Sequence, residues 1–164
     1  MRFLSLLAIL VVFAGCGNSE RDSAERAAEE MATAAQERAY QTMMDGHDRV
    51  MPMMGQINQL QKTILARLEA GGIPEEQREL LQAGYEQLED AGDGMMEWMQ
   101  QVKPLDDLRD EMSQDGIRDW TREMTSDIAT VETQLNSSIA SAEKLLGLAG
   151  SHGHDHGDGH DHDH

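Results

Sequence analysis

Cysteine, proline, aromatic and basic residues are all scarce in this sequence. A single cysteine, Cys16, has no partner for a disulfide within the chain. Aromatic residues make up 4% and prolines number three, whereas alanine, glutamate, glutamine, leucine and methionine abound, which favours helices around a modest core. Lysine and arginine total 13 against 31 aspartates and glutamates. The formal net charge of −18 argues against binding to nucleic acid or to an anionic membrane face, because both would repel the protein.

A long hydrophobic run is lacking as well. The longest apolar stretch runs from Phe3 to Phe13, directly after Arg2. At about 1.5 Å per residue it is too short to cross the roughly 30 Å hydrocarbon core of a membrane. Its position and flanking residues are typical of an export signal, which we predict over residues 1–15.

The end of this signal carries a lipidation motif. Phe13-Ala14-Gly15-Cys16 resembles the lipobox of bacterial lipoproteins, although leucine is commoner at the position of Phe13. The resemblance implies that Cys16 becomes the lipidated first residue of a cell-envelope protein, tethered to a membrane through that lipid. Gly17, instead of the aspartate that retains lipoproteins in the inner membrane, implies the outer membrane. The alternative is an ordinary secretory signal followed by an incidental thiol.

Helical periodicity extends over most of the remaining chain. Apolar residues recur every three or four positions, and no segment alternates as a strand would. Gly71-Gly72-Ile73-Pro74 and Lys103-Pro104 are helix-stopping segments, and Asp115-Gly116 is a turn-prone pair. Pro52 removes a backbone donor and predicts a kink in the first helix. We expect helices over 24–70, 75–102, 105–114 and 117–147.

The predicted fold class is all-α. Short connections between long helices favour an antiparallel three-helix bundle running up, down and up, with a short fourth helix as the variant. The polar residues 17–24 suggest a tether, and the alanine-rich segment after them a helical stalk. The predicted regions are the signal peptide (1–15), the lipidated cysteine with tether and stalk (16–38), the bundle (39–149) and a His-rich tail (150–164).

The tail is the sharpest chemical signal in the chain. Imidazoles interleaved with carboxylates on a glycine-containing backbone can converge on a borderline cation such as Zn²⁺, Ni²⁺ or Cu²⁺. We expect this segment to be disordered without a metal ion, since it has nothing to bury. The alternative is an acidic tail that only keeps the protein soluble. The candidate ligands are His152, His154, His156, His160, His162 and His164.

A second group of donors lies in the predicted bundle. Methionines cluster around His47 and again around Trp98. If the first two helices form an antiparallel hairpin about residues 71–74, facing residues have numbers that sum to about 145. His47 then lies near Trp98, Met51 near Met95 and Met44 near Gln101. The same arithmetic places Gly92 and Gly94 across from Pro52, and folding back at Lys103-Pro104 brings Met112 level with Met95 and Met96.

This layer is a candidate soft-metal site, because thioether sulfur together with imidazole suits Cu(I) better than zinc or hard cations. The alternative is ordinary core packing, in which flexible methionines fill an irregular layer and the histidine is a core residue. The candidate ligands in the bundle are His47, Met43, Met51, Met54, Met95 and Met99.

Two strings support the location and the fold by resemblance. His47-Asp48-Arg49-Val50-Met51-Pro52-Met53-Met54-Gly55 and Met95-Met96-Glu97-Trp98-Met99 look like small helical lipoproteins of Bacteroidetes type, some of which carry the label "viral A-type inclusion protein". The resemblance covers residues 40–145. That family has no settled activity, so it implies fold and location only.

Signals for catalysis are missing from the sequence. It has no glycine-rich phosphate loop, no His-Glu-x-x-His motif and no nucleophile elbow, and the part before the tail has one histidine. We therefore predict a non-enzymatic envelope lipoprotein that binds or buffers copper or zinc. The alternative is a structural or protein-interaction lipoprotein whose methionines are core residues.

Overall fold

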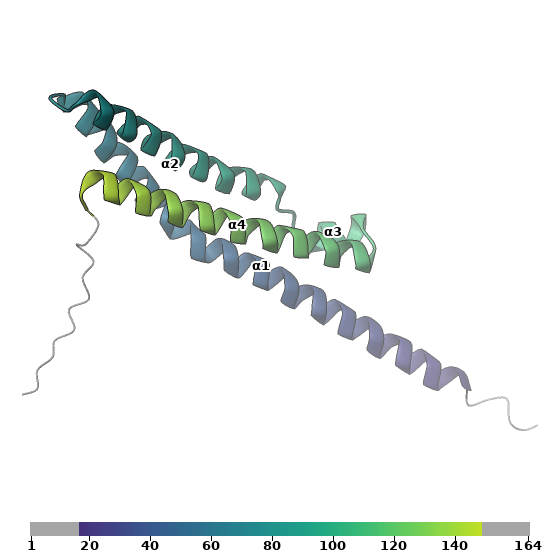
Figure 1. The fold of residues 1–164 in the computed structure, drawn as a ribbon. Helices are drawn as coiled ribbons and strands as arrows, with labels where there is room; N and C mark the ends of the chain where they lie inside the picture. The colour runs from purple at the N-terminus through teal and green to yellow at the C-terminus, as the bar shows by residue number, and fades with distance from the viewer. Residues whose placement is uncertain (1–16, 149–164) are drawn as a thin grey trace, which may run out of the picture.

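The computed structural model describes residues 17–148 (Figure 1). Within this range the chain forms four helices and no strand, so the predicted all-α class is confirmed there. The helices are α1 (Gly17–Ala70), α2 (Glu75–Gln101), α3 (Leu105–Glu111) and α4 (Gln114–Leu146).

The three long helices pack together as a bundle (Figure 1). α2 returns along α1, and α4 runs in the same direction as α1. Residue numbers rise together along the interface of α1 with α4, where Gly46 lies beside Ile128 and Arg49 beside Glu132. The antiparallel three-helix arrangement is therefore confirmed for the described residues, and α3 is a short fourth helix.

Most of the helix ends follow the predicted stop signals. Gly71 and Gly72 have φ of 65° and 72°, a left-handed conformation that glycine adopts without strain. Pro74 directly precedes α2, where its fixed φ suits the start of a helix and its missing N–H removes no helical hydrogen bond. α4 ends at Leu146, and Gly147 caps it in the left-handed conformation.

Two helix boundaries differ from the prediction. α1 begins at Gly17 rather than near residue 24, because the polar segment continues the alanine-rich helix that follows it. The break after α3 lies at Met112 and Ser113 rather than at Asp115-Gly116. Ser113 is the N-cap of α4, and its Oγ accepts a hydrogen bond from the Gly116 N–H at 3.2 Å. The turn-prone pair therefore belongs to the first helical turn.

The chain does not fold back at Lys103-Pro104 as predicted. The Tyr40 hydroxyl donates to the Lys103 carbonyl at 3.0 Å, and further along the Arg109 guanidinium donates to Glu37 at 3.2 Å. α3 thus continues along α1 in the direction of α2, and the chain reverses after it. Met112 consequently lies beyond α3 and not level with Met95 and Met96. Burial raises the pKa of the Tyr40 hydroxyl, which widens the pH range over which it remains a donor.

The core lies between α1, α2 and α4. Buried side chains recur at helical spacing on each helix, which confirms the periodicity on which the prediction depends. None of the helices in the described range is both long and apolar enough to cross a membrane. The central residues of the core include Met43, Val50, Ile64, Leu81, Leu88, Met95, Ile128 and Leu135.

The N-terminal part of α1 extends beyond the other helices (Figure 1). Residues 19–31 are all exposed, and the Met31 side chain keeps 66% of its surface accessible. This segment corresponds to the predicted stalk. At about 1.5 Å per residue, the 54 residues of α1 span roughly 80 Å.

Candidate metal centre

His47 lies on α1 where this helix faces α2. Its ring stacks on Trp98, with 5.9 Å between ring centroids and 26° between planes. The predicted proximity of these two residues is therefore confirmed. The imidazole remains partly accessible, with 21% of the side chain exposed. His47 is thus held against the core but can be reached from solvent.

Trp98 supports one face of this imidazole and is itself rigidly held. The indole is 2% exposed, and its Nε1–H donates to the backbone carbonyl of Met124 on α4 at 2.9 Å. A buried ring with its only donor satisfied has a fixed orientation. The position of His47 is therefore determined by packing that involves all three long helices.

Asp48 contacts the His47 ring at its edge. Its Oδ1 lies 2.9 Å from His47 Nδ1. With the imidazole neutral and the proton on Nδ1, that nitrogen donates to the carboxylate and Nε2 presents a lone pair. A carboxylate bound to one ring nitrogen is the usual supporting arrangement for a histidine whose other nitrogen binds a metal. Asp48 was not among the residues predicted from the sequence for this site.

The methionines separate into three groups by burial. Met43 and Met95 are fully buried, and Met124 is nearly so, all three inside the main core. Their thioethers fill space between helices, which is the core-packing role described above for this layer. Met51 and Met96 are exposed, at 39% and 47% of their surface. The half-buried group packs against the edge of the core and consists of Met44, Met53, Met54 and Met99.

The backbone irregularities of this layer do not all face one another. Helix α1 continues through Pro52, which is exposed. Gly92 faces α1, since a Cβ there would lie 3.6 Å from Met54 Cε. Gly94 instead faces α4, near Gln134 and Val131. The predicted placement of Gly94 across from Pro52 is therefore wrong, because hairpin arithmetic gives the level of a residue but not its direction around the helix.

Gly46 is a structural feature of the site that was not predicted from the sequence. A Cβ at this position would lie 2.8 Å from Ile128 Cγ2 on α4. The missing side chain therefore lets α1 approach α4 directly beside His47. The sequence signal for this contact is a glycine inside a strongly helical segment. Because glycine lowers helix propensity, its presence there indicates that close packing requires it.

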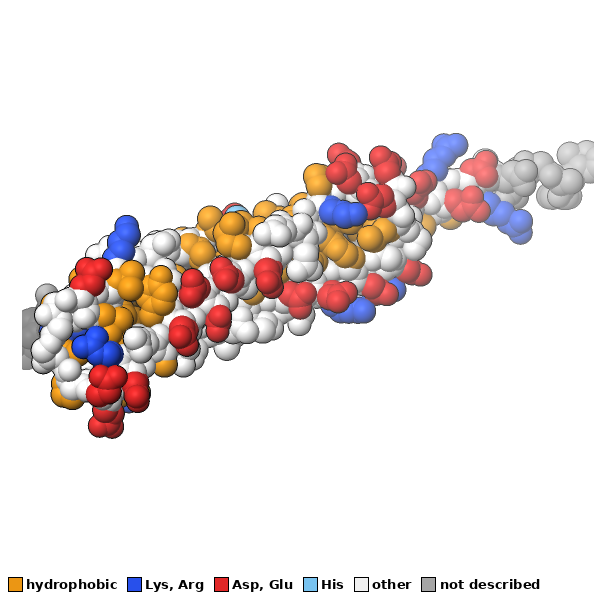
Figure 2. Space-filling model, turned by 90° about the horizontal axis from the view of Figure 1, so that it is seen from above, with side chains coloured by type: hydrophobic (Ala, Val, Ile, Leu, Met, Phe, Trp, Pro, Cys, Tyr) orange, Lys and Arg blue, Asp and Glu red, His pale blue; other side chains and the backbone are white. Residues whose placement is uncertain are grey.

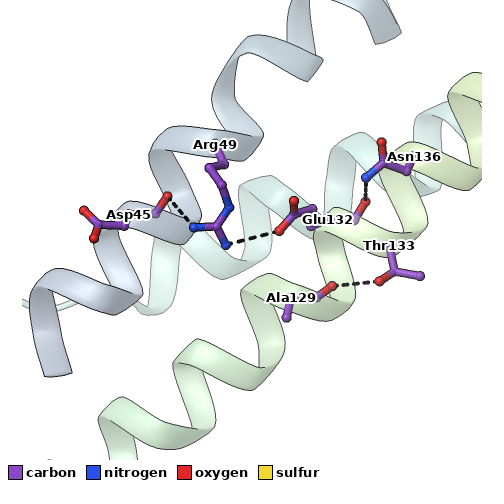
Figure 3. Close-up of polar contacts among 6 residues, drawn as sticks. All are labelled: Asp45, Arg49, Ala129, Glu132, Thr133 and Asn136. Carbon is purple, nitrogen blue, oxygen red and sulfur yellow. Dashed lines mark hydrogen bonds and ion pairs between the residues drawn. The ribbon is translucent and has the colours of Figure 1, made fainter.

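An ion pair between Arg49 and Glu132 joins α1 to α4 near His47 (Figure 3). The Arg49 guanidinium lies 3.3 Å from the Glu132 carboxylate and also donates to the Asp45 carbonyl at 3.2 Å. Both partners of the pair are solvent-accessible, so its contribution to stability is small, about 0–1 kcal/mol. The contact shows that these two residues lie at the same level of the two helices.

Within residues 17–148, no group of three or more histidine, cysteine, aspartate and glutamate side chains could hold a metal ion. The metal-binding chemistry available at His47 is therefore one imidazole nitrogen, held by Asp48, and the thioethers of Met44 and Met51 one helical turn away on α1. Such donors suit a soft monovalent cation rather than a hard divalent one. It stays a prediction that Met51 lies near Met95 and that Met44 lies near Gln101.

The other predicted site residues lie outside the described part of the chain. These are the lipidation site and the tail ligands, namely Cys16, His152, His154, His156, His160, His162 and His164. No family model matches this sequence, and comparisons with curated proteins and with solved structures find no match either.

Proposed function

We propose that this chain is a cell-envelope lipoprotein that binds or buffers transition metal, copper or zinc. Cys16 and the lipobox-like sequence before it support the lipid anchor. The acidic helical bundle then serves as the scaffold, and metal is held by the tail and by the layer around His47. Gly17 after the cysteine supports the outer membrane as the location.

The observation that carries the proposal is the concentration of nitrogen donors at one end of the chain. Residues 151–164 contain all the histidines except His47. Their alternation with aspartate and glycine allows several imidazoles to reach one ion, whereas a merely solvating tail needs none. Because an imidazole must be neutral to bind, metal affinity should fall below about pH 6.5.

The arrangement in the bundle supports the same function independently. His47 is oriented by Asp48 and Trp98 and remains partly accessible, and thioethers lie on the same helix. The two groups of donors differ in softness, so they prefer different metal ions. The tail takes borderline divalent ions, and the bundle takes Cu(I).

Metal titration of the purified mature protein tests this function. We expect Zn²⁺, Ni²⁺ and Cu²⁺ to bind the full chain in calorimetry. Binding of the divalent ions should be lost when all six tail histidines are changed to glutamine, a variant that keeps chain length and acidity. Affinity of the full chain no greater than that of the glutamine variant would contradict a metal-binding tail.

The second candidate function is a spacer or partner-binding lipoprotein. The observations that favour it are the long exposed N-terminal part of α1 and the burial of Met43, Met95 and Met124 in the core. In that case both the full chain and the glutamine variant would fail to bind copper or zinc.

A further inference from the structure

We infer that Met44, His47 and Met51 form a Cu(I) site on the rim of the α1–α2 interface. His47 Nε2 and the two thioether sulfurs are the ligands, and Trp98 is the floor of the site. The inference rests on the proposed metal-binding function and makes it specific. It replaces the buried candidates Met43 and Met95 with a helix face that a metal ion can reach.

The spacing along α1 places these three side chains together. Met44 precedes His47 by three residues, and Met51 follows it by four. Residues at these separations are neighbours on a helix, with about 5–6 Å between Cβ atoms. One imidazole is thus flanked by a thioether one turn before it and another one turn after it.

The direction of helical side chains places Met51 over the turn of His47, and His47 over the turn of Met44. Side chains on an α-helix lean toward its N-terminus, over the preceding turn. Met51 therefore leans toward the turn that holds His47. Its exposure of 39% leaves the sulfur free to rotate, because an unbranched thioether with three rotatable bonds adapts to a ligand.

The imidazole is already prepared for one additional bond. Nδ1 is engaged with Asp48 at 2.9 Å, and the ring face rests on Trp98. A ligand that is held in place before binding loses less conformational entropy when the metal arrives. The bond also selects the tautomer in which Nε2 accepts the metal.

Burial excludes the deeper methionines as ligands. Met43 and Met95 have no accessible surface and belong to the main core. A metal bound to either would have to separate α1 from α2 and lose the packing there. Met44 is half-buried at the edge of the same core and needs no such opening.

The donor set also determines which ion is preferred. Two neutral thioethers and one neutral imidazole bring no negative charge to the ion, and such soft ligands favour Cu(I) over Zn²⁺. Cu(I) enters and leaves by ligand exchange, without a change in oxidation state. The bundle therefore discriminates against the divalent ions that the tail accepts.

Competition for Cu(I) tests the site in the chain whose six tail histidines are glutamine. Bicinchoninate serves as the competing chelator under a reducing atmosphere. We expect one Cu(I) to bind, and Met51→Leu and His47→Phe each to weaken binding by at least about tenfold, the loss typical even of a supporting residue. His47→Phe retains a ring against Trp98, and circular dichroism checks that each variant folds.

Met31→Leu is the matched control, since it removes an exposed thioether from the same helix far from His47. It should leave Cu(I) affinity unchanged. In spectra of ¹³C-methyl methionine, Cu(I) should shift the Met44 and Met51 signals and leave the Met31 signal in place. An equal molar amount of Zn²⁺ should shift neither.

Two outcomes overturn the inference. One is an affinity for Cu(I) that is the same in Met51→Leu and His47→Phe as in their parent. The other is a shift of the Met43 and Met95 methyl signals without one at Met51. If the full chain binds divalent ions but the glutamine variant binds no Cu(I), this inference fails together with the bundle part of the proposed function, and metal binding by the tail stands. If neither protein binds any of these ions, both fail.

Discussion

At position 46 the packing of α1 on α4 depends on the absence of a side chain. Gly46→Ala would place a Cβ 2.8 Å from Ile128 Cγ2. Ile128 is buried, and its branched Cγ2 cannot swing away as the end of a flexible chain can. We expect overpacking of about 1–3 kcal/mol to outweigh the gain of about 1 kcal/mol in helix propensity. Unfolding in urea should show a net loss of about 1 kcal/mol.

Two other glycines provide controls for this measurement. Gly55 lies on the same helix, and a Cβ added there would have open space within 4 Å, so Gly55→Ala should stabilise the protein by about 0.5–1 kcal/mol. At Gly84 the close atom is Leu145 Cδ1, the end of a flexible side chain, so Gly84→Ala should cost less than Gly46→Ala. Stabilisation by Gly46→Ala equal to that by Gly55→Ala would contradict the proposed close approach.

Only part of the candidate site could be predicted from the sequence. Antiparallel register sufficed to place His47 near Trp98, since level along a hairpin follows from counting. The register could not show that Met43 is buried and Met51 exposed, because their burial depends on where α4 lies. The partnership of His47 with Asp48 depends on a side-chain rotamer, which no periodicity specifies.

Among the elements, the start of α4 depends on a single side-chain cap. Ser113 Oγ accepts from the Gly116 N–H, which otherwise has no helical partner at this end. Ser113→Ala should therefore reduce stability by about 1 kcal/mol in urea unfolding. Ser126→Ala, at an exposed position within the same helix, should have little effect or stabilise slightly because alanine is the better helix former. Equal effects of the two changes would show that the cap has no role.

Helix α3 explains why the element boundaries were only partly predictable. Glycine and proline marked the ends of α1 and α2, because these residues act on the backbone locally. The break at Met112 and Ser113 has only the weaker signal of a capping serine. The direction of α3 is set by contacts distant in sequence, such as Arg109 with Glu37. Local patterns contain no information on such contacts.

At the scale of the whole molecule, the two ends of the described range, residues 17 and 148, lie far apart (Figure 1). α4 ends where α1 ends, since a Cβ at Gly84 of α2 would lie 2.7 Å from Leu145 and 3.9 Å from Ile64. The last described residues, up to Leu148, therefore lie at the end of the bundle opposite to the start of α1 (Figure 1). The surface between them carries many carboxylates and few basic groups on the face seen in Figure 2.

For a protein anchored through Cys16, this geometry predicts that Leu148, and with it the start of the proposed metal-binding segment, lies away from the bilayer. α1 spans roughly 80 Å, and an acidic chain is repelled by anionic lipid, so the bundle should stand off from the surface. With Cys16 lipidated and its thiol blocked, Arg21→Cys and Leu148→Cys each provide one site for a donor dye. On anionic vesicles containing an acceptor lipid, we expect energy transfer from position 21 and little from position 148. Cys16→Ser should leave the protein off the vesicles, and equal transfer from both positions would mean that α1 lies flat on the membrane.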